Sequence, residues 1–390
     1  MVINPKYGGM TMSEEPELGS IRKHFSKVKD PRVERTKRHK LLDMILIAIC
    51  GVICGADSWV DIELFGKSKL EWLKSFLTLP NGIPSHDTFG RVFAIINPEE
   101  FEKSFMEWVQ AINELTQGQV IAIDGKQLRG SQNSESGKEA IYMVSAWATE
   151  NELVLGQRKV DDKSNEITAI PKLLRLLEIA GCIVTIDAIG TQTKIAKTIV
   201  EQGGDYLLAV KENQGNLYED IHDLFEDDQH YNFSGAPYDY AKSVNKDHGR
   251  IEIRQCWAIS DPEYLAQIRD RERWHSLKSL AMIVSERRIG EKSEIQTRYF
   301  ITSLESQAEK ILKVKRSHWG IENRLHWVLD IAFDEDRSRV RKDNAPQNFA
   351  VLRHMALNLL KQEHTEKAGI KAKRLKCGWD ADYLLKVLAG

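Results

Sequence analysis

The strongest constraint on the fold is an alternation of short apolar runs and amphipathic helical segments between residues 117 and 210. The apolar runs have the length and the flanking turn residues of buried strands, whereas the longer segments repeat their apolar positions at helical spacing. We predict three strands, a helix, a strand, a helix and a strand, in chain order, at 120–123, 142–148, 153–160, 167–180, 183–186, 194–202 and 206–210. This order predicts an α/β fold with a mixed sheet and helices on both faces.

The regions on either side of this alternation have other patterns of apolar and polar residues. Residues 1–116 contain amphipathic helical patterns and few strand signals, which predicts an N-terminal helical domain. Four further strands are expected within 212–303, at 239–243, 251–259, 279–285 and 296–302. We interpret 117–362 as one RNase H-like domain that contains this β-rich insertion, although several α/β folds begin with a similar element order. The last residues, 363–390, are basic and less regular, and we expect a tail there.

Composition and length exclude several classes of protein. The 390 residues are enough for two or three domains. Five cysteines, an odd number with no CxxC pair, favour a reducing compartment over a disulfide framework. The longest apolar stretch, 41–56, is interrupted by Asp43 and is short for a membrane span, so a buried helix is expected. With no signal-peptide pattern at the N-terminus, we predict a soluble, cytoplasmic protein without membrane contact.

Two of the predicted strands end in an aspartate. Asp124 follows the strand at 120–123, and Asp187 follows the strand at 183–186. Ligands of open α/β sheets bind at the carboxyl ends of the strands, and adjacent strands would bring the two carboxylates together. Close carboxylates repel one another unless a cation lies between them, and Mg²⁺ prefers such oxygen ligands. An aspartate at a strand end can also merely begin a turn, so each residue alone is ambiguous.

A third acid is expected from a late helix, in the segment 319–331. Glu322, His326 and Asp330 are spaced four apart and line one face of that helix. This face could point into a site or into solvent. A zinc site formed by His318, Glu322 and His326 is disfavoured, because the two histidines are separated by two helical turns, about 12 Å.

Three basic segments suit a polyanionic partner even though the formal net charge is −2. The segment 22–40 holds nine lysines and arginines against two acids. The other two segments directly follow the first aspartate and the late helix. The side chains that we expect to contact DNA in these two segments are Lys126, Arg129, Ser131, Arg337, Arg339 and Arg341. Each segment could instead be ordinary solvated surface.

Three sequence blocks resemble the DDE transposases of the H-repeat-associated type from bacterial insertion sequences. These blocks are 123–126 with 129–131, 186–188 with 191–192, and 318–330 extended by Phe333, Glu335 and Asp336. Segments 30–32 and 83–89 match as well, so that the resemblance runs from about residue 21 to residue 360. The chain departs from the signature of the broader transposase group, because His318 stands where that group has an arginine and no lysine follows in 325–333.

The resemblance implies an RNase H-like catalytic core in which Asp124, Asp187 and Glu322 are the catalytic and metal-binding triad. It implies two Mg²⁺ ions, for which Mn²⁺ could substitute, and a homodimer on double-stranded DNA, namely the terminal repeats and the target. Asp330, Glu335 and Asp336 remain rival third acids.

The expected reaction begins when water frees a 3′-hydroxyl at an element end, and this hydroxyl then attacks target DNA. Residues 1–116 are expected to recognise the ends, and the protein would be nucleoid-associated in a bacterial cytoplasm.

Two alternatives remain, a nuclease of RNase H-like fold without strand transfer and an inactive DNA-binding regulator derived from a transposase. A nucleotide-dependent metabolic enzyme is disfavoured because neither GxxxxGK[ST] nor GxGxxG occurs.

Overall fold

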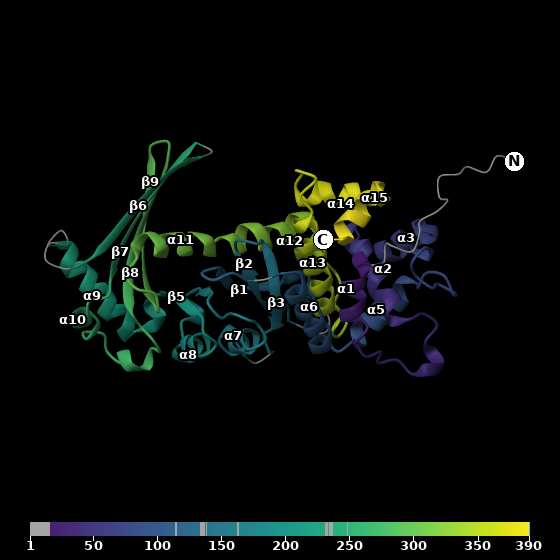
Figure 1. The fold of residues 1–390 in the computed structure, drawn as a ribbon, viewed down its shortest axis with the longest axis horizontal. Coiled ribbons are helices and arrows are strands. Elements are labelled where there is room, and N and C mark those ends of the chain that lie inside the picture. Colours follow the sequence, from purple (N-terminus) through teal and green to yellow (C-terminus); the bar gives the residue numbers. More distant parts are fainter. Residues whose placement is uncertain are drawn as a thin grey trace. The chain divides into compact units, whose positions relative to one another are not determined.

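A computed structural model describes residues 16–389 except 114, 133–136, 138, 162–163, 231–232, 234–236 and 248. The chain divides into two compact units. Unit 1 comprises 1–114, 127–142 and 326–390, and unit 2 comprises 115–126 and 143–325. Figure 1 labels the elements along the chain.

Unit 1 is built from helices. They are α1 (Pro16–Phe25), α2 (Leu41–Ile53), α3 (Trp59–Ser68), α4 (Leu70–Lys74), α5 (His86–Ile95), α6 (Pro98–Ile112), α12 (Trp327–Ala332), α13 (Ala345–Gln362), α14 (Ile370–Trp379) and α15 (Ala381–Ala389). The predicted buried helix at 41–56 corresponds to α2, which packs against α13, α3 and α14. No helix among the described residues is both long and apolar enough to cross a membrane.

The C-terminal residues differ from the prediction of a less regular basic tail, because they form α14 and α15. Leu384, Val387 and Leu388 of α15 are buried at helical spacing. The guanidinium of Arg374 in α14 donates to the carbonyl of Val52 at 3.0 and 2.8 Å, at the end of α2. Arg374, one of the basic residues that suggested a tail, is therefore buried and caps the end of α2.

Unit 2 contains one nine-stranded sheet in the order β3-β2-β1-β4-β5-β9-β8-β7-β6. The strands are β1 (Val120–Leu128), β2 (Ile141–Ala148), β3 (Leu153–Lys159), β4 (Ile183–Ile186), β5 (Asp205–Val210), β6 (Asp239–Asp247), β7 (Arg250–Ile259), β8 (Ser279–Ile289) and β9 (Lys292–Thr302). Strands β1, β4 and β5 run parallel, whereas β2–β3, β5–β9 and the pairs from β9 to β6 are antiparallel.

Every strand predicted from an apolar run is present, but several strands are longer than their apolar parts. The expected strands at 279–285 and 296–302 extend to 279–289 and 292–302. The added residues are mostly charged and exposed, so hydropathy could not mark these strand ends. The four strands from β6 to β9 are joined to the rest of the sheet through the pairing of β9 with β5.

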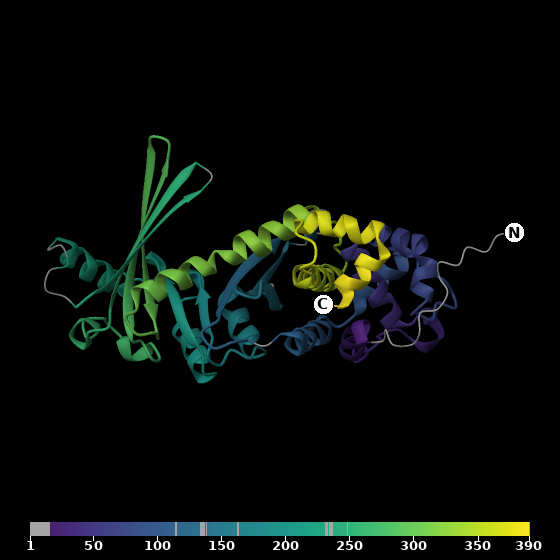
Figure 2. The ribbon, with the colours of Figure 1, turned by 45° about the horizontal axis from the view of Figure 1, so that its top comes forward.

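The helices of unit 2 lie on both faces of the sheet, as predicted. They are α7 (Glu166–Leu174), α8 (Thr193–Glu201), α9 (Asn216–His230), α10 (Pro262–Leu265) and α11 (Ala308–His318). Figures 1 and 2 show α11 on one side of the sheet and α7 and α8 on the other. Ile183 packs in a buried cluster with Ile311 and Val314 of α11. Ile186, three residues later in β4, lies beside Gly190 together with Ile170 of α7. Alternate residues of β4 therefore face opposite helical layers.

Candidate active site

Asp124 and Asp187 occupy equivalent places on two neighbouring parallel strands. The last register pair between β1 and β4 is Ile123 with Ile186, and the two aspartates directly follow it. The residues that precede each aspartate are buried, so the sheet core fixes both backbones. The structure thus confirms that the predicted strands are adjacent and that both acids come at the carboxyl ends of their paired stretches.

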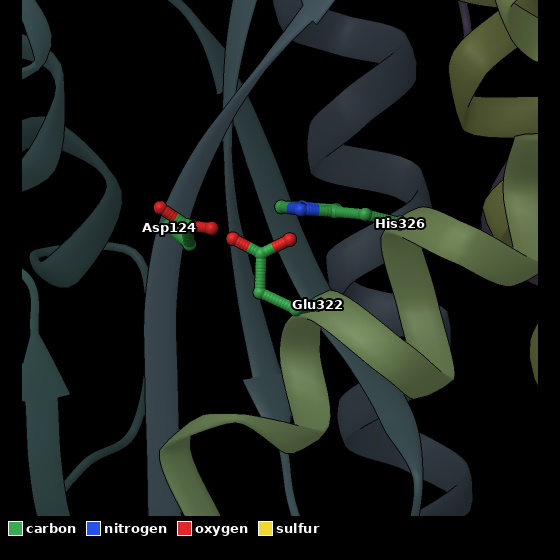
Figure 3. A group of neighbouring side chains, drawn as sticks. All are labelled: Asp124, Glu322 and His326. Atoms are coloured by element: carbon green, nitrogen blue, oxygen red, sulfur yellow. The ribbon is translucent and has the colours of Figure 1, made fainter. Parts of the chain in front are cut away.

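Glu322 comes from a π-helical segment, Ile321–His326, between α11 and α12. Ile321 and Leu325 are fully buried and anchor this segment, while Glu322 is exposed. One ligand atom from each of Asp124, Glu322 and His326 lies within 4.8 Å of the other two. Figure 3 shows the three side chains gathered together. Short π-helical turns are rare in proteins and occur often at functional sites. Here such a turn carries two side chains toward Asp124.

This group has the chemistry of a divalent cation site. Two ionised carboxylates at such a separation repel one another, and a bound cation would neutralise that repulsion. Carboxylate oxygens suit Mg²⁺ and Mn²⁺, and an imidazole nitrogen is a common ligand of transition metals. The residues present therefore fit a divalent metal. Among the described residues, the group contains Asp124, Glu322 and His326, and Asp187 lies outside it.

His326 was not predicted as a ligand, although the sequence contained a signal for it. Its spacing of four from Glu322 placed both side chains on one helix face. The zinc hypothesis paired His326 with His318 and was disfavoured by their separation. In the structure His326 instead accompanies Asp124, a residue on a strand far away in the sequence.

Asp187 has a different environment. Its side chain is 51% exposed, and the ammonium of Lys211 lies 3.4 Å from its Oδ1. Lys211 directly follows β5, the next parallel strand of the sheet. An ion pair between groups this exposed is weak, so either partner can be drawn to a stronger ligand at little cost.

His318 connects the helix that leads to Glu322 with the strand that leads to Asp187. Its Nδ1 lies 2.8 Å from Oγ1 of Thr185, the residue two before Asp187 in β4. Burial lowers the pKa of His318 to about 4, against opposing contributions from Asp187 and Glu322. The ring is therefore neutral near pH 7, and it holds the end of α11 against the sheet.

The three rival acids are placed elsewhere. Glu335 is buried, with its carboxylate 3.5 Å from the guanidinium of Arg353. Asp336 pairs with Arg129 at 3.4 Å. Asp330 lies in α12, outside the group of ligand atoms around Asp124. This arrangement favours Glu322 as the acid that accompanies Asp124.

Comparison with known proteins shows the family of the chain. Residues 115–359 match the model of the transposase DDE domain, and residues 22–109 match a region described as DDE_Tnp_1-associated. The H repeat-associated putative transposase YhhI of Escherichia coli is 42% identical over 378 residues, 96% of this chain and 99% of that protein. The chain belongs to the H-repeat-associated DDE transposases.

Two further relatives show the range of the family. The putative transposase YncI of Escherichia coli O157:H7 is 42% identical over 378 residues, 95% of this chain and 95% of that protein. A short relative named inactive transposase YbfQ, from Escherichia coli, is 46% identical over 76 residues, 20% of this chain and 90% of that protein. Family membership and retained activity are therefore separate questions.

The predicted DNA contacts after Asp124 differ from one another in accessibility. The side chain of Arg129 is 75% exposed, and that of Lys126 is half-buried. Ser131 is buried; its hydroxyl donates to the carbonyl of Leu128 at 2.6 Å and accepts from the amide of Ile141 at 2.8 Å. Ser131 therefore supports this turn of the DDE domain and does not present its hydroxyl at the surface.

The basic residues after the late helix lie beside this turn within unit 1. Arg337, Arg339 and Arg341 are exposed, and Arg341 Nε donates to the carbonyl of Gly130 at 3.0 Å. A Cβ at Gly130 would lie 2.0 Å from the carbonyl oxygen of Ser338, so only glycine fits there. Two basic segments that are far apart in sequence therefore form one surface.

The basic stretch at 22–40 is partly neutralised in the structure. Four of its nine cations form ion pairs with carboxylates, namely Lys27, Lys29, Arg32 and Lys37. The charge that this stretch offers to a partner is therefore smaller than its sequence suggests.

Proposed function

We propose that this protein is an active transposase that cleaves DNA at the ends of an insertion element and joins the freed ends to target DNA. The observation that carries the proposal is the convergence of the carboxylates of Asp124 and Glu322, which come from a strand and a helix far apart in sequence. Asp187, on the strand next to Asp124, is the third acid of the proposed catalytic triad.

The topology of the sheet supports an RNase H-like core for this activity. Strands β3-β2-β1-β4-β5 are consecutive in the sheet, β1, β4 and β5 are parallel, and β2 and β3 are antiparallel. This arrangement places the carboxyl ends of β1 and β4 side by side, where ligands bind in open α/β sheets. The strands β6 to β9 then form the predicted insertion, and 1–116 the domain for recognition of the DNA ends.

Divalent cations, Mg²⁺ or Mn²⁺, would be held by Asp124 and Glu322 together with His326 and Asp187. When bound, two such ions activate the attacking oxygen and neutralise charge on the leaving oxygen of an in-line displacement. Because the exposed Glu322 can be reached from solvent, a phosphodiester can approach the same place. We infer that Lys211 pairs with Asp187 in the absence of DNA. This ion pair would break when cations and DNA are bound, so that Asp187 can contact a cation.

The other residues of the chain would bind and orient DNA. Arg129 and the exposed Arg337, Arg339 and Arg341 can contact phosphates of the bound DNA, and Lys126 follows Asp124 by two residues in β1. No side chain needs to form a covalent intermediate, because water and then the DNA 3′-hydroxyl are the nucleophiles. Pairing of two DNA ends requires two active sites, so we propose a homodimer on DNA.

The experiment that tests this function uses purified protein, Mg²⁺ and a linear DNA that carries the sequence flanking the coding region. The proposal predicts cleavage at inverted repeats and, with a supercoiled plasmid added, covalent joining of the cleaved ends to the plasmid. Cleavage without joined products would identify a nuclease. Specific binding with no cleavage would identify a regulator derived from a transposase.

A further inference from the structure

A basic groove in unit 2 has no role in the function as proposed so far. It has a volume of about 620 Å³ and lies between α11 and the outer parts of β7, β8 and β9. Eight cationic side chains line it against three carboxylates. The cations are Arg250, Arg254, Arg287, Arg298, Lys313, Lys315, Arg316 and Arg324. This concentration contrasts with the formal net charge of −2 for the whole chain.

The groove arises from a change of side-chain character along one face of three strands. Nearer the core, Cys256 of β7, Ile283 of β8 and Phe300 of β9 pack against α11 in one apolar cluster. Further along the same faces the cluster residues give way to polar and charged ones. Arg254 is paired in register with Ser285, and Ser285 with Gln296. The strands therefore continue past their core as a polar wall opposite α11.

Some of the cations are held in place, and others are available to a ligand. Arg254 donates to Asn245 Oδ1 at 3.0 Å and contacts Glu252, while Arg316 donates to the same Asn245 oxygen at 3.0 Å. Arg287 and Lys313 are exposed, and no acid in the described part of the chain forms an ion pair with either one.

The cations in the groove also repel one another. Burial together with Arg298 and Arg254 lowers the pKa of Lys315 to about 8. A polyanion in the groove would relieve this repulsion and would favour the charged form of Lys315. The groove thus has the electrostatic character of a polyanion site.

The end of the groove lies close to the proposed catalytic acid in the chain. Trp319, Gly320, Asn323 and Arg324 line it, and Glu322 lies among them in the sequence. Trp319 is 54% exposed, with the ammonium of Lys315 5.8 Å from the centre of its ring. An exposed indole beside cations is typical of surfaces on which nucleic-acid bases stack.

We propose that this groove binds the phosphodiester backbone of one DNA strand that leads to the catalytic site. The backbone of one strand of a duplex fits the groove, because the groove is too small to enclose a whole helix of DNA but has cations along its length. The proposal rests on the proposed function for the identity of the polyanion. It assigns DNA contact to residues from β7, β8, β9 and α11, which none of the basic segments of the sequence includes.

The test measures DNA binding as a function of salt, because each phosphate contact contributes about 0.9 to the slope of log K against log salt for duplex DNA. The Asp124→Asn protein is used throughout so that the DNA stays intact. In this background, the double variant Arg287→Gln/Lys313→Gln should bind a linear duplex more weakly, with a slope shallower by about two.

A matched control is the double variant Arg175→Gln/Lys194→Gln, which removes one arginine and one lysine from exposed positions on the α7 and α8 side of the sheet. It should leave the slope unchanged. Glu294→Gln, which removes an acid from the groove, should strengthen binding. Circular dichroism verifies that each variant is folded.

A slope equal to that of the parent in the groove variant would overturn the inference. Equal losses in the groove variant and the control variant would overturn it as well, because binding would then follow total charge. Failure of the proposed function is a separate result: it appears as wild-type protein that cleaves no DNA, whatever the salt dependence of its variants.

Discussion

The two strand ends that carry Asp124 and Asp187 are alike in sequence and register but differ in what surrounds them. Asp124 is half-buried and shares a group of ligand atoms with Glu322 and His326, whereas Asp187 is half exposed beside Lys211. The position of a strand in the sheet therefore determines where its acid lies. The side chains that face the acid determine which groups it contacts when no ligand is bound. Substitutions at the two acids and at their neighbours can test this difference.

Asp124→Asn should reduce the rate of DNA cleavage by on the order of a thousandfold or more. Catalytic residues that act as a unit lose most of their combined effect when one of them is replaced. The amide keeps the size of the carboxylate but loses the charge that attracts a cation. The measurement is the single-turnover cleavage rate in Mg²⁺. Asp336→Asn, at a rival acid that pairs with Arg129, serves as the control and should keep most activity.

Asp187→Asn should reduce cleavage by about a hundredfold, with more Mg²⁺ needed for half-maximal rate. This loss is smaller because Asp187 lies outside the group formed by Asp124 and Glu322. The measurement is cleavage rate across a series of Mg²⁺ concentrations. A wild-type rate and Mg²⁺ requirement would remove Asp187 from the triad and would leave His326 as the third ligand.

The ring of His318 links α11 to β4, the strand that leads to Asp187, and its low pKa predicts a pH dependence of stability. The folded-state pKa of about 4 is below the ordinary value of 6.5, so protonation favours the unfolded chain. The contribution of the neutral ring is complete above pH 6.5 and is lost as the pH falls toward 4. We expect a loss of about 2 kcal/mol, after allowance for partial exposure.

Urea unfolding at pH 7, 5 and 4 measures this dependence. In His318→Gln, which keeps a polar group near Thr185 but cannot titrate, the fall in unfolding free energy between pH 7 and pH 4 should be smaller than in the wild type. Identical pH profiles for the two proteins would mean that the ring has the same pKa in the folded and the unfolded chain, which would contradict the low pKa.

Lys211→Met should have the smallest effect and the opposite direction. Removal of a weak ion pair of about 0.2–1 kcal/mol frees Asp187 for a cation and lowers the Mg²⁺ concentration at half-maximal rate by at most about fivefold. Lys194→Met, at an exposed lysine of α8, is the matched control. A higher Mg²⁺ requirement in Lys211→Met would show that Lys211 assists the site.

Much of the fold could be predicted from the sequence, because burial leaves a periodic signal. The apolar runs at 120–123 and 183–186 correspond to β1 and β4, and the acids that follow them lie on adjacent strands. The outer parts of β8 and β9 were missed because they are charged. The helical C-terminus was missed because its basic composition suggested a tail, although Leu384 and Val387 lie on a buried face.

The candidate site was predictable only in part. The spacing of Glu322 and His326 in the sequence predicts that both lie on one helix face. Their partner, Asp124 of β1, is far away in the sequence and is revealed only by the structure. The basic groove could not be predicted at all. Its cations are spread over β7, β8, β9 and α11, and no local charge pattern reveals that three strands and a helix bring them together.

We propose that Asp124 and Glu322 jointly hold a divalent cation, with His326 beside them. Titration of the purified protein with Mn²⁺, followed by calorimetry or by the electron paramagnetic resonance of the free ion, tests it without DNA. We predict binding in the wild type, its loss in Glu322→Gln and its weakening by about tenfold to a hundredfold in His326→Ala. Equal Mn²⁺ affinity in the wild type and Glu322→Gln would contradict the account.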